Sequence, residues 1–482
     1  MERLKNYIGG RWVEPKTDRF LADKNPGTGE TLAEVPLSTR EDVDFAVKEA
    51  SKAFEEWRSI PLPERVSLLV KLRNLLTEKF EDLARLITIE HGKTLEESKG
   101  DMRRTLENID AAIGALSLVQ GSFLQEVARG IDERMMRVPV GVFAIITPFN
   151  FPILIPFWFL PYALACGNTV VIKPSEQVPK CMNEVAKLLE EAGLPGGVVN
   201  IVHGDKEAVD ALLRHPEVKG VASVTSTPVA KYIYAKAASQ GKRVLCQGGA
   251  KNFLVVMPDA DMERTVPSIL TSVFGNAGQR CLAGSNVVAV GGIGDELVKL
   301  LVEEASKIRV GYGLDEGVDM GPVISERAKR RIEGYIEKGI EEGAKLLLDG
   351  RNVKVDKYPN GYYLGPTILD HVRPDMIVAR EEIFGPVMTV IRAESLDEAI
   401  DMINSNPFGN AAVIYTSNGR AAREFAQKVE CGNIGVNIGL PAPMAFFPFC
   451  GMKDSFFGDL HGQSPDAFEF FTHKKVVVER WW

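Results

Sequence analysis

The segment from Val138 to Ile172 contains no Asp, Glu, Lys or Arg, and this constrains the fold more than any other feature of the chain. A membrane-spanning helix would need an apolar run free of breaks, whereas prolines stand here at positions 139, 148, 152, 156 and 161. Both flanks, 140–146 and 169–172, are short runs rich in β-branched residues. The pattern predicts a strand, a buried helix and a second strand in a parallel sheet covered on both faces.

Short apolar runs alternate with helical stretches along most of the chain. The first series of runs lies at 140–146, 169–172, 198–202, 220–224 and 243–246, with helices expected at 180–192 and 206–214. The second series lies at 253–257, 286–290 and 387–391, with helices expected at 261–275, 294–307 and 324–342. Further helices are expected at 41–57 and 63–86. This order is typical of α/β folds, so we expect two α/β domains.

Two remaining segments, 120–137 and the end of the chain from 474 to 482, have the pattern of exposed strands with apolar content. Exposed strand edges that carry apolar side chains suit pairing with another chain. We therefore expect a homo-oligomer, either a dimer or a homotetramer.

Composition and charge exclude several classes of function. The chain has 482 residues and a formal net charge of −8, and it has no long run of Lys or Arg that could neutralise a phosphate backbone, so nucleic acid is not expected as a partner. The first residues lack an apolar signal segment, which predicts a cytoplasmic location without a membrane partner. The six cysteines and six histidines are dispersed, which favours a site without metal and without a disulfide framework.

Cys281 is the candidate nucleophile. It lies between Gly278 and Gly284 and directly follows Arg280. A thiol in such a place can be exposed in a cleft, and the neighbouring cation is expected to favour its thiolate form. A cysteine of this kind is more often structural when it stands alone, so further motifs are needed.

Four separated blocks supply them: Thr147-Pro-Phe-Asn-Phe-Pro152, Lys173-Pro-Ser-Glu176, Gly278-Gln-Arg-Cys281 and Glu381-Glu-Ile-Phe-Gly-Pro386. With these blocks in this order, the chain resembles the aldehyde dehydrogenase superfamily from about Tyr7 to its end. The segment 441–458 is most similar to the coenzyme A-acylating branch, the methylmalonate- and malonate-semialdehyde dehydrogenases.

The resemblance implies an α/β fold with three parts. A Rossmann-type dinucleotide-binding domain would comprise residues 1–119 and 138–250, and an α/β catalytic domain residues 251–450. A small β oligomerisation extension would comprise residues 120–137 and 464–482.

The resemblance also implies residue roles. Cys281 would attack the aldehyde, and the Asn150 amide with the Cys281 backbone N–H would hold the oxyanion. The residues implied to bind NAD are Thr147, Phe149, Lys173, Glu176, Gln177, Ser226, Gly248 and Glu382. A carboxylate at Glu176 favours NAD over NADP, whereas Thr225 and Ala230 depart from glycines of many relatives and leave the diphosphate position in doubt.

The stretch Gln247-Gly-Gly-Ala-Lys251 matches Glu-Leu-Gly-Gly-Lys of the hydrolytic relatives, in which the glutamate activates water. Glutamine accepts no proton, so coenzyme A is the expected acyl acceptor. Arg104 and Arg280 match arginines of the branch that are linked to the substrate carboxylate. The resemblance thus implies oxidation of malonate or methylmalonate semialdehyde, with decarboxylation to acetyl- or propionyl-coenzyme A.

Two alternatives stay open at this stage. The first is a hydrolytic aldehyde dehydrogenase that uses another base, such as Glu382 or a chain of waters, and releases a free acid. The second is a catalytically inactive NAD-binding protein, for which the losses of glycine at 225 and 230 would be the sign.

Overall fold

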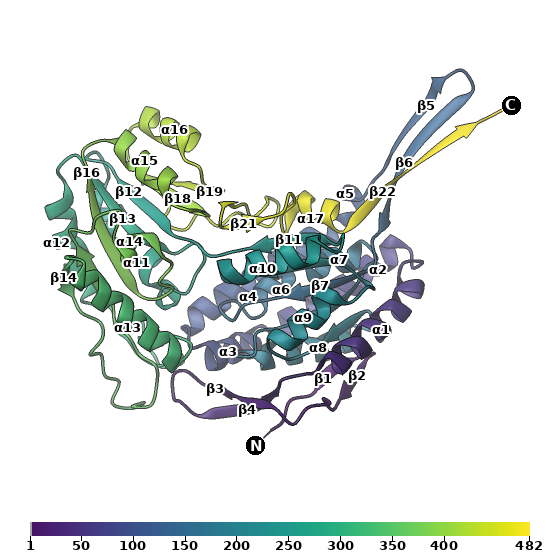
Figure 1. The fold of residues 1–482 in the computed structure, drawn as a ribbon, viewed down its shortest axis with the longest axis horizontal. Coiled ribbons are helices and arrows are strands. Elements are labelled where there is room, and N and C mark those ends of the chain that lie inside the picture. Colours follow the sequence, from purple (N-terminus) through teal and green to yellow (C-terminus); the bar gives the residue numbers. More distant parts are fainter. Residues whose placement is uncertain (1) are drawn as a thin grey trace.

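Five parallel strands form the centre of the first sheet in the computed structural model, which describes residues 2–482 (Figure 1). They are β7 (Val142–Ile146), β8 (Thr169–Lys173), β9 (Val199–Ile201), β10 (Val218–Val224) and β11 (Arg243–Gln247). Their order is β9-β8-β7-β10-β11, so the chain reverses its direction of travel across the sheet between β7 and β10. Ligands of open α/β sheets bind beyond the carboxyl ends of the strands at such a switch point. β1 (Asn6–Ile8), β2 (Arg11–Val13) and β21 (Phe456–Phe457) complete the sheet.

Both faces of this sheet are buried, as the charge-free segment predicts. Along β7, Val142, Ala144 and Ile146 belong to one core, whereas Phe143 and Ile145 belong to another, because successive side chains of a strand point to opposite faces. The first core is shared with α1 (Arg40–Trp57), α9 (Lys206–Arg214) and α10 (Thr227–Ala238). The second is shared with α2 (Leu62–Glu78), α3 (Phe80–His91), α4 (Leu95–Ile113) and α8 (Pro179–Glu191).

Two helices differ from the sequence prediction. The helix expected at 63–86 is divided into α2 and α3 at Lys79, whose backbone (φ −93°, ψ 12°) leaves the helical region. The single buried helix expected between β7 and β8 is two short ones, α6 (Leu154–Phe157) and α7 (Leu160–Ala165). Pro161 lies in the first turn of α7, where its missing N–H removes no helical hydrogen bond.

The second sheet has the order β14-β15-β16-β13-β12-β18-β19. Its strands are β12 (Asn252–Val256), β13 (Gly284–Val290), β14 (Lys345–Leu348), β15 (Thr367–Asp370), β16 (Val387–Ala393), β18 (Ala411–Tyr415) and β19 (Asn433–Val436), and only β14 is antiparallel to its neighbour. Its helices are α11 (Met262–Phe274), α12 (Gly294–Ala305), α13 (Glu326–Glu341), α14 (Ile377–Arg380), α15 (Leu396–Ser405) and α16 (Gly419–Lys428). The predicted runs and helices of the second series all occur.

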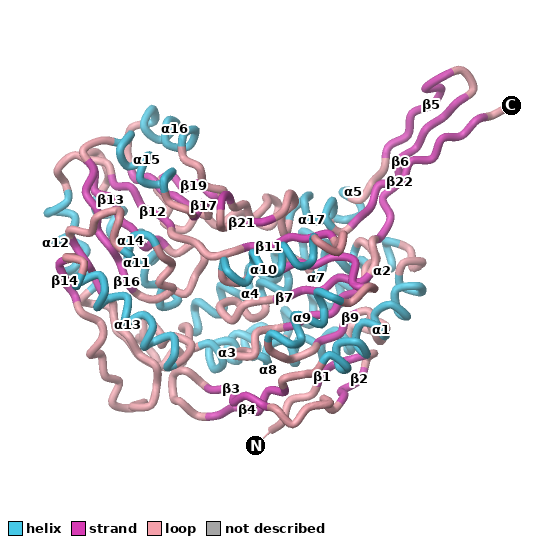
Figure 2. The backbone as a smooth tube through the Cα atoms, viewed as in Figure 1, coloured by secondary structure: helices cyan, strands magenta, loops and turns pink. Residues whose placement is uncertain are grey.

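The segments predicted as exposed strands form a third, three-stranded sheet of β5 (Ser122–Ala128), β6 (Ile131–Pro139) and β22 (Thr472–Arg480), in the order β22-β6-β5. This β arm projects from the body of the molecule (Figures 1 and 2). Phe123, Leu124, Val476 and Val478 are each more than half exposed. The residues just before β22 are buried instead of exposed. They form α17 (Ser464–Phe470), whose Phe468 and Phe470 lie in the core with Phe143.

The remaining elements are α5 (Ala115–Leu118), the hairpin β3 (Phe20–Lys24) and β4 (Thr31–Pro36), and the pair β17 (Phe408–Gly409) and β20 (Met452–Lys453). None of the helices described in residues 2–482 has the length and apolar character needed to cross a membrane.

Candidate active site

The residues expected to bind the cofactor gather at one edge of the first sheet. Thr147 directly follows β7, Lys173 is the last residue of β8, Ser226 follows β10 and Gly248 follows β11. Because these strands are parallel, their carboxyl ends meet at the same edge, on both sides of the switch point. The topology therefore brings residues that lie up to a hundred positions apart in the sequence into one site.

Lys173 and Glu176 form an ion pair at this edge. The Lys173 ammonium is nearly buried, and it donates to Glu176 Oε2 at 3.0 Å and to the Gly204 carbonyl at 2.9 Å. The Glu176 side chain is one-third exposed. An accessible carboxylate accepts hydrogen bonds from ribose hydroxyls and repels a 2′-phosphate.

The start of α10 lies at this edge, where the diphosphate of the cofactor was expected. Ser226 is the exposed N-cap residue of the helix. Ala230, one of the two positions at which the resemblance implied glycine, is fully buried in the core with Ile233, so its methyl group packs on the sheet. Thr225 is only partly buried, and its backbone N–H donates to the Gln247 carbonyl at 3.0 Å. Of these two positions, only Thr225 is therefore accessible from outside the core.

Phe149 and Glu382 come from opposite domains of the expected division. The Phe149 ring stacks on His91 and meets Phe384 edge-on, with both ring centroids 5.8 Å away. The Glu382 carboxylate accepts the backbone N–H of Ala250 at 2.9 Å, and burial raises its pKa to about 7. Gln177 lies in the turn after β8, where its backbone N–H donates to Ser175 at 3.3 Å.

The loop that carries Cys281 has a strained conformation. It begins where α11 ends, and Asn276 and Ala277 both have a positive φ, of 56° and 50°. Gly278 also has a positive φ of 71°, and a Cβ there would lie 2.1 Å from the Gly385 carbonyl oxygen. Only glycine fits at position 278, because the backbone of the next segment passes directly against it.

Two asparagine amides hold Cys281 by its backbone. Asn252 Nδ2 and Asn410 Nδ2 donate to the Cys281 carbonyl oxygen at 2.8 Å and 2.7 Å. Asn252 begins β12 and Asn410 immediately precedes β18, so two neighbouring strands of the second sheet fix the residue from the same side. The second sheet thus helps to fix the backbone of Cys281, which does not depend on the conformation of its loop alone.

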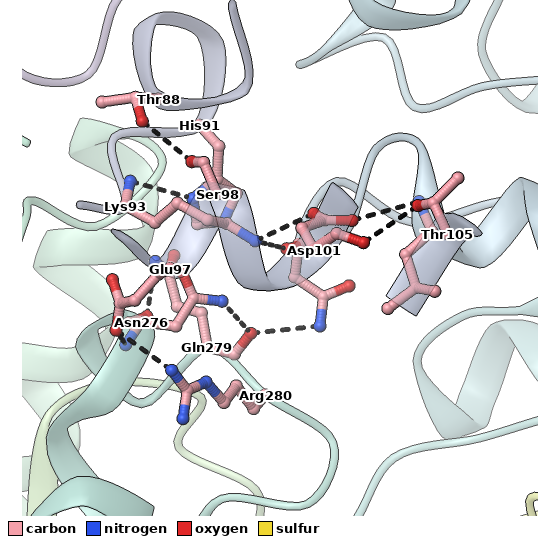
Figure 3. Close-up of polar contacts among 12 residues, drawn as sticks. Thr88, His91, Lys93, Glu97, Ser98, Asp101, Thr105, Asn276, Gln279 and Arg280 are labelled. Atoms are coloured by element: carbon pink, nitrogen blue, oxygen red, sulfur yellow. Dashed lines mark hydrogen bonds and ion pairs between the residues drawn. The ribbon is translucent and has the colours of Figure 1, made fainter. Parts of the chain in front are cut away.

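Arg280 favours the Cys281 thiolate, as expected, but its effect on the pKa of the thiol is smaller than that of burial. Burial raises the pKa of the Cys281 thiol to about 12, and the Glu382 carboxylate adds to the increase. Backbone hydrogen bonds from Cys281 and Leu282 and, to a smaller extent, the charge of Arg280 lower that pKa. The Arg280 guanidinium is itself paired with Glu97 Oε1 at 3.0 Å (Figure 3). Burial thus opposes the thiolate more strongly than Arg280 favours it.

Asn150 lies next to the loop that carries Cys281. Its side chain is buried, and Nδ2 donates to the Gln279 carbonyl oxygen at 3.0 Å. A primary amide has two N–H groups, so one donor remains after this bond. The turn after β7 and the loop before Cys281 are thereby joined directly.

Of the two candidate carboxylate-binding arginines, Arg104 belongs to α4 and Arg280 is paired with Glu97 of the same helix. Glu97, the partner of Arg280, and Arg104 are seven residues apart in this helix, which is two turns or about 10 Å. Arg104 donates to Glu107 Oε2 at 2.8 Å and to the Ala442 carbonyl at 3.0 Å. It therefore ties α4 to the segment 442–445, in which Met444 is half exposed.

Gln247 is the last residue of β11 and is buried, and its Nε2 donates to the Phe449 carbonyl oxygen at 3.3 Å. The side-chain amide thus donates a hydrogen bond to this carbonyl oxygen, which a carboxylate at position 247 could not do. No ionisable base stands at this position.

Sequence reasoning missed five residues that hold the site together: Lys93, Glu97, Asp101, Asn252 and Asn410. For the two asparagines a signal exists, since each directly precedes or begins a run of buried strand residues, where a polar side chain needs a specific partner. Glu97 and Asp101 lie in α4 and Lys93 lies in the turn just before it, in a stretch rich in charged residues, so nothing local distinguishes them.

The chain is similar to known proteins over nearly its whole length. The chain belongs to the aldehyde dehydrogenase family, whose model matches residues 12–477. A malonate-semialdehyde dehydrogenase of Geobacillus kaustophilus is 50% identical over 481 residues, which is 100% of this chain and 99% of the relative. A malonate-semialdehyde dehydrogenase of Halalkalibacterium halodurans is 49% identical over 100% of this chain and 99% of its own length.

Solved structures are similar over the whole chain as well. The crystal structure of a methylmalonate-semialdehyde dehydrogenase from Oceanimonas doudoroffii has a TM-score of 0.98 at 43% identity and covers 100% of this chain and 99% of its own. A protein of Sinorhizobium meliloti assigned to the same activity and crystallised with NAD has a TM-score of 0.98 at 42% identity, covering 100% and 98%. The expected α/β aldehyde dehydrogenase fold is confirmed.

Proposed function

We propose that this protein oxidises malonate semialdehyde or methylmalonate semialdehyde with NAD, through a thioester on Cys281, and transfers the acyl group to coenzyme A with loss of carbon dioxide. The observation that carries the proposal is an anchored cysteine combined with a glutamine at position 247, the usual place of the hydrolytic base. The names of the full-length relatives, malonate- and methylmalonate-semialdehyde dehydrogenases, support the choice of substrate.

The residues present fit NAD. The Thr147 hydroxyl is buried without a hydrogen-bond partner in the described chain, at the carboxyl end of β7, and the partly exposed carboxylate of Glu176 suits ribose hydroxyls. A relative crystallised with NAD has the same fold. Phe149, Lys173, Gln177, Ser226 and Gly248 would complete the site, and Glu382 would hold the nicotinamide ribose. Bound NAD supplies the hydride acceptor of the oxidation.

Cys281 begins the reaction by adding to the aldehyde carbon. The thiol must first lose its proton, which a pKa of about 12 opposes, so a cationic nicotinamide nearby would favour the thiolate. Addition places negative charge on the aldehyde oxygen. The free N–H of Asn150 and the backbone N–H of Cys281 would donate to that oxyanion. Oxidation then leaves the acyl group bound to sulfur.

The substrate carboxylate is assigned to Arg280 and Arg104. Arginine holds a carboxylate with two parallel hydrogen bonds and stays charged at all relevant pH values. Once the thioester has formed, this carboxylate is β to an acyl carbon. Cleavage of the bond to the carboxylate releases carbon dioxide and leaves an enolate, which the same oxyanion donors would stabilise and a proton would quench.

Deacylation requires a nucleophile that needs no strong base. The thiolate of coenzyme A attacks the acyl carbon, a bond from carbon to the coenzyme sulfur forms, and the Cys281 thiolate leaves. The second candidate is hydrolysis with Glu382 as the base, which its raised pKa of about 7 favours. The product distinguishes the two: acyl-coenzyme A in the first case and a free acid in the second.

The test is to incubate the protein with NAD, coenzyme A and each semialdehyde in turn and to identify products by mass spectrometry. We expect acetyl-coenzyme A from malonate semialdehyde and propionyl-coenzyme A from methylmalonate semialdehyde, with release of carbon dioxide. Free acid as the main product in the presence of coenzyme A would contradict the proposal and select hydrolysis.

We also propose a division into domains and a homo-oligomer. Residues 1–119 and 138–250 would form the dinucleotide-binding domain and 251–450 the catalytic domain, because each contains its own sheet and core. The β arm carries exposed apolar side chains, and the edge of β19 exposes Val436 and the nearby Ile438. Pairing of these edges with another copy would cover both, in a dimer or tetramer that light scattering would identify.

A further inference from the structure

The ammonium group of Lys93 is buried at the centre of the site, with 1% of its side chain exposed. It donates to the Asn150 backbone carbonyl at 2.7 Å and is paired with Asp101 Oδ2 at 3.3 Å. It also lies 4.1 Å from the centroid of the Phe151 ring, within the range of a cation–π interaction. One cation thus contacts two consecutive residues of the turn that follows β7.

Asp101 contacts the other end of the same turn. Its side chain is completely buried, and its other oxygen, Oδ1, accepts the backbone N–H of Leu154 at 3.2 Å. Asn150 and Leu154 are therefore held at both ends of the turn by one ion pair. The turn belongs to the segment 138–172, which contains no charge of its own, so Lys93 and Asp101 supply the charges from outside it.

The backbone of Lys93 is fixed as firmly as its side chain. Its N–H donates to His91 Nδ1 at 3.2 Å, in the turn between α3 and α4 (Figure 3). A Cβ added at Gly313 would lie 2.3 Å from the Lys93 carbonyl oxygen, and one added at Gly321 would lie 1.9 Å from that of Gly92. Neighbouring segments therefore pass directly against this turn. They restrict the position of the Lys93 backbone and hence of its ammonium group.

A buried ion pair is a poor source of net stability, because the loss of hydration offsets most of the attraction. A well-defined geometry is what such a pair can provide. Here the geometry it defines is that of Asn150, whose side chain already gives one N–H to Gln279 and has one left. The direction of this last N–H depends on where the backbone of Asn150 lies, and Lys93 binds that backbone.

We propose that Lys93 is a positioning residue that holds Asn150 so that its free amide N–H points at the oxygen of the aldehyde attacked by Cys281. The inference rests on the oxyanion role of Asn150 in the proposed function. Lys93 does not itself touch the reacting atoms. Its contribution to the rate passes through Asn150, which makes it measurable by a double-mutant cycle.

The experiment measures the rate of the first NADH turnover, before deacylation, in the variants Lys93→Met, Asn150→Ala and the double variant. Loss of one oxyanion donor typically costs about 10²–10³ in rate. We expect Lys93→Met to lower the rate at least about 10-fold in the native background and less than about 2-fold in the Asn150→Ala background. Lys99→Met, which removes a lysine of α4 that pairs with Glu81 and Glu96, is the matched control and should leave the rate unchanged.

Two readouts separate positioning from loss of structure. The NAD affinity, followed by fluorescence, and the rate of Cys281 alkylation by iodoacetamide should be the same in Lys93→Met as in the native protein. If Lys93→Met does not fold, because Asp101 is left buried without its partner, Lys93→Met/Asp101→Asn takes its place: it removes both charges and keeps an acceptor for the Leu154 N–H.

The inference is overturned if Lys93→Met, or its replacement, lowers the rate equally in both backgrounds, or not at all. It is also overturned if NAD affinity and alkylation fall along with the rate. Should Asn150→Ala leave the rate unchanged, the oxyanion role of Asn150 in the proposed function fails, and this result is distinct from an effect of Lys93 that is independent of Asn150.

Discussion

Gly275 lies directly against the guanidinium of Arg280, and this contact allows a sharp test of the carboxylate-binding role of Arg280. A Cβ at position 275 would lie 2.7 Å from Arg280 Nη1 and 2.9 Å from Cζ, too close for either atom to stay. The backbone of Gly275 (φ −55°, ψ 139°) is open to alanine, so the substitution strains nothing else locally. Since the clash is with the end of a flexible side chain, we expect Gly275→Ala to fold and Arg280 to move away from Glu97.

The loss follows from the interaction that Arg280 can no longer make. A hydrogen bond to a charged group contributes about 1.5–3 kcal/mol, and about 1.4 kcal/mol corresponds to a factor of ten. We therefore expect kcat/KM for malonate semialdehyde to fall roughly 10- to 150-fold in Gly275→Ala, while kcat/KM for propanal, which has no carboxylate, changes less than about 3-fold.

Steady-state assays with both aldehydes measure this ratio. Gly100→Ala is the matched control: it adds the same methyl group in α4, where no atom lies within 4 Å of the new Cβ, and both activities should stay at their native values. Equal losses for malonate semialdehyde and propanal in Gly275→Ala would refute the assignment of Arg280 to the carboxylate.

Four further predictions concern Cys281 and Gln247. Because burial raises the pKa of Cys281 to about 12, its alkylation by iodoacetamide should rise about tenfold per pH unit from pH 7 to 9 without a plateau, and a plateau near neutral pH would show a thiolate that the structure does not support. NAD should accelerate this alkylation at pH 7, since its cationic ring favours the thiolate; an unchanged rate would place the nicotinamide elsewhere. Cys281→Ala should abolish aldehyde oxidation and keep NAD affinity within about 3-fold, as fluorescence titration would measure, and residual turnover would exclude the thioester. Gln247→Glu places a proton acceptor at the hydrolytic position and should release free acid without coenzyme A, about 10²-fold faster than the native protein; no gain would mean that position 247 does not face the thioester.

The strands of the first sheet were predictable because their pattern is repeated. Each apolar run from β7 to β11 is bounded by polar turns, and the absence of charge between β7 and β8 leaves only a two-sided sheet as an arrangement. The β arm was also predictable, since β6 and β22 keep apolar residues in otherwise polar strands. The break between α2 and α3 was not, because Lys79 is an ordinary helix residue and the change of direction is imposed by packing on α4 and α8.

The candidate site was predictable only where a reactive side chain stands in a recognisable sequence motif. Cys281 and Arg280 stand in a recognisable motif, but the sequence does not show that burial raises the pKa of the Cys281 thiol more than Arg280 lowers it. The charge of Arg280 is paired with Glu97, a residue 183 positions away in sequence. Lys93 illustrates the same limit, because its role depends on the Asn150 backbone and on Asp101, and neither contact leaves a trace in local periodicity.

The central claim is that the thioester on Cys281 waits for coenzyme A, and the amplitude of NADH formation in its absence tests this most directly. Rapid mixing of the protein with NAD and malonate semialdehyde should give a burst of about one NADH per active site, followed by a slow steady rate. Addition of coenzyme A should then raise the steady rate and convert the bound acyl group to acetyl-coenzyme A. A steady rate that is fast from the start, is unaffected by coenzyme A and yields free acid would contradict the account and require a deacylating base other than residue 247.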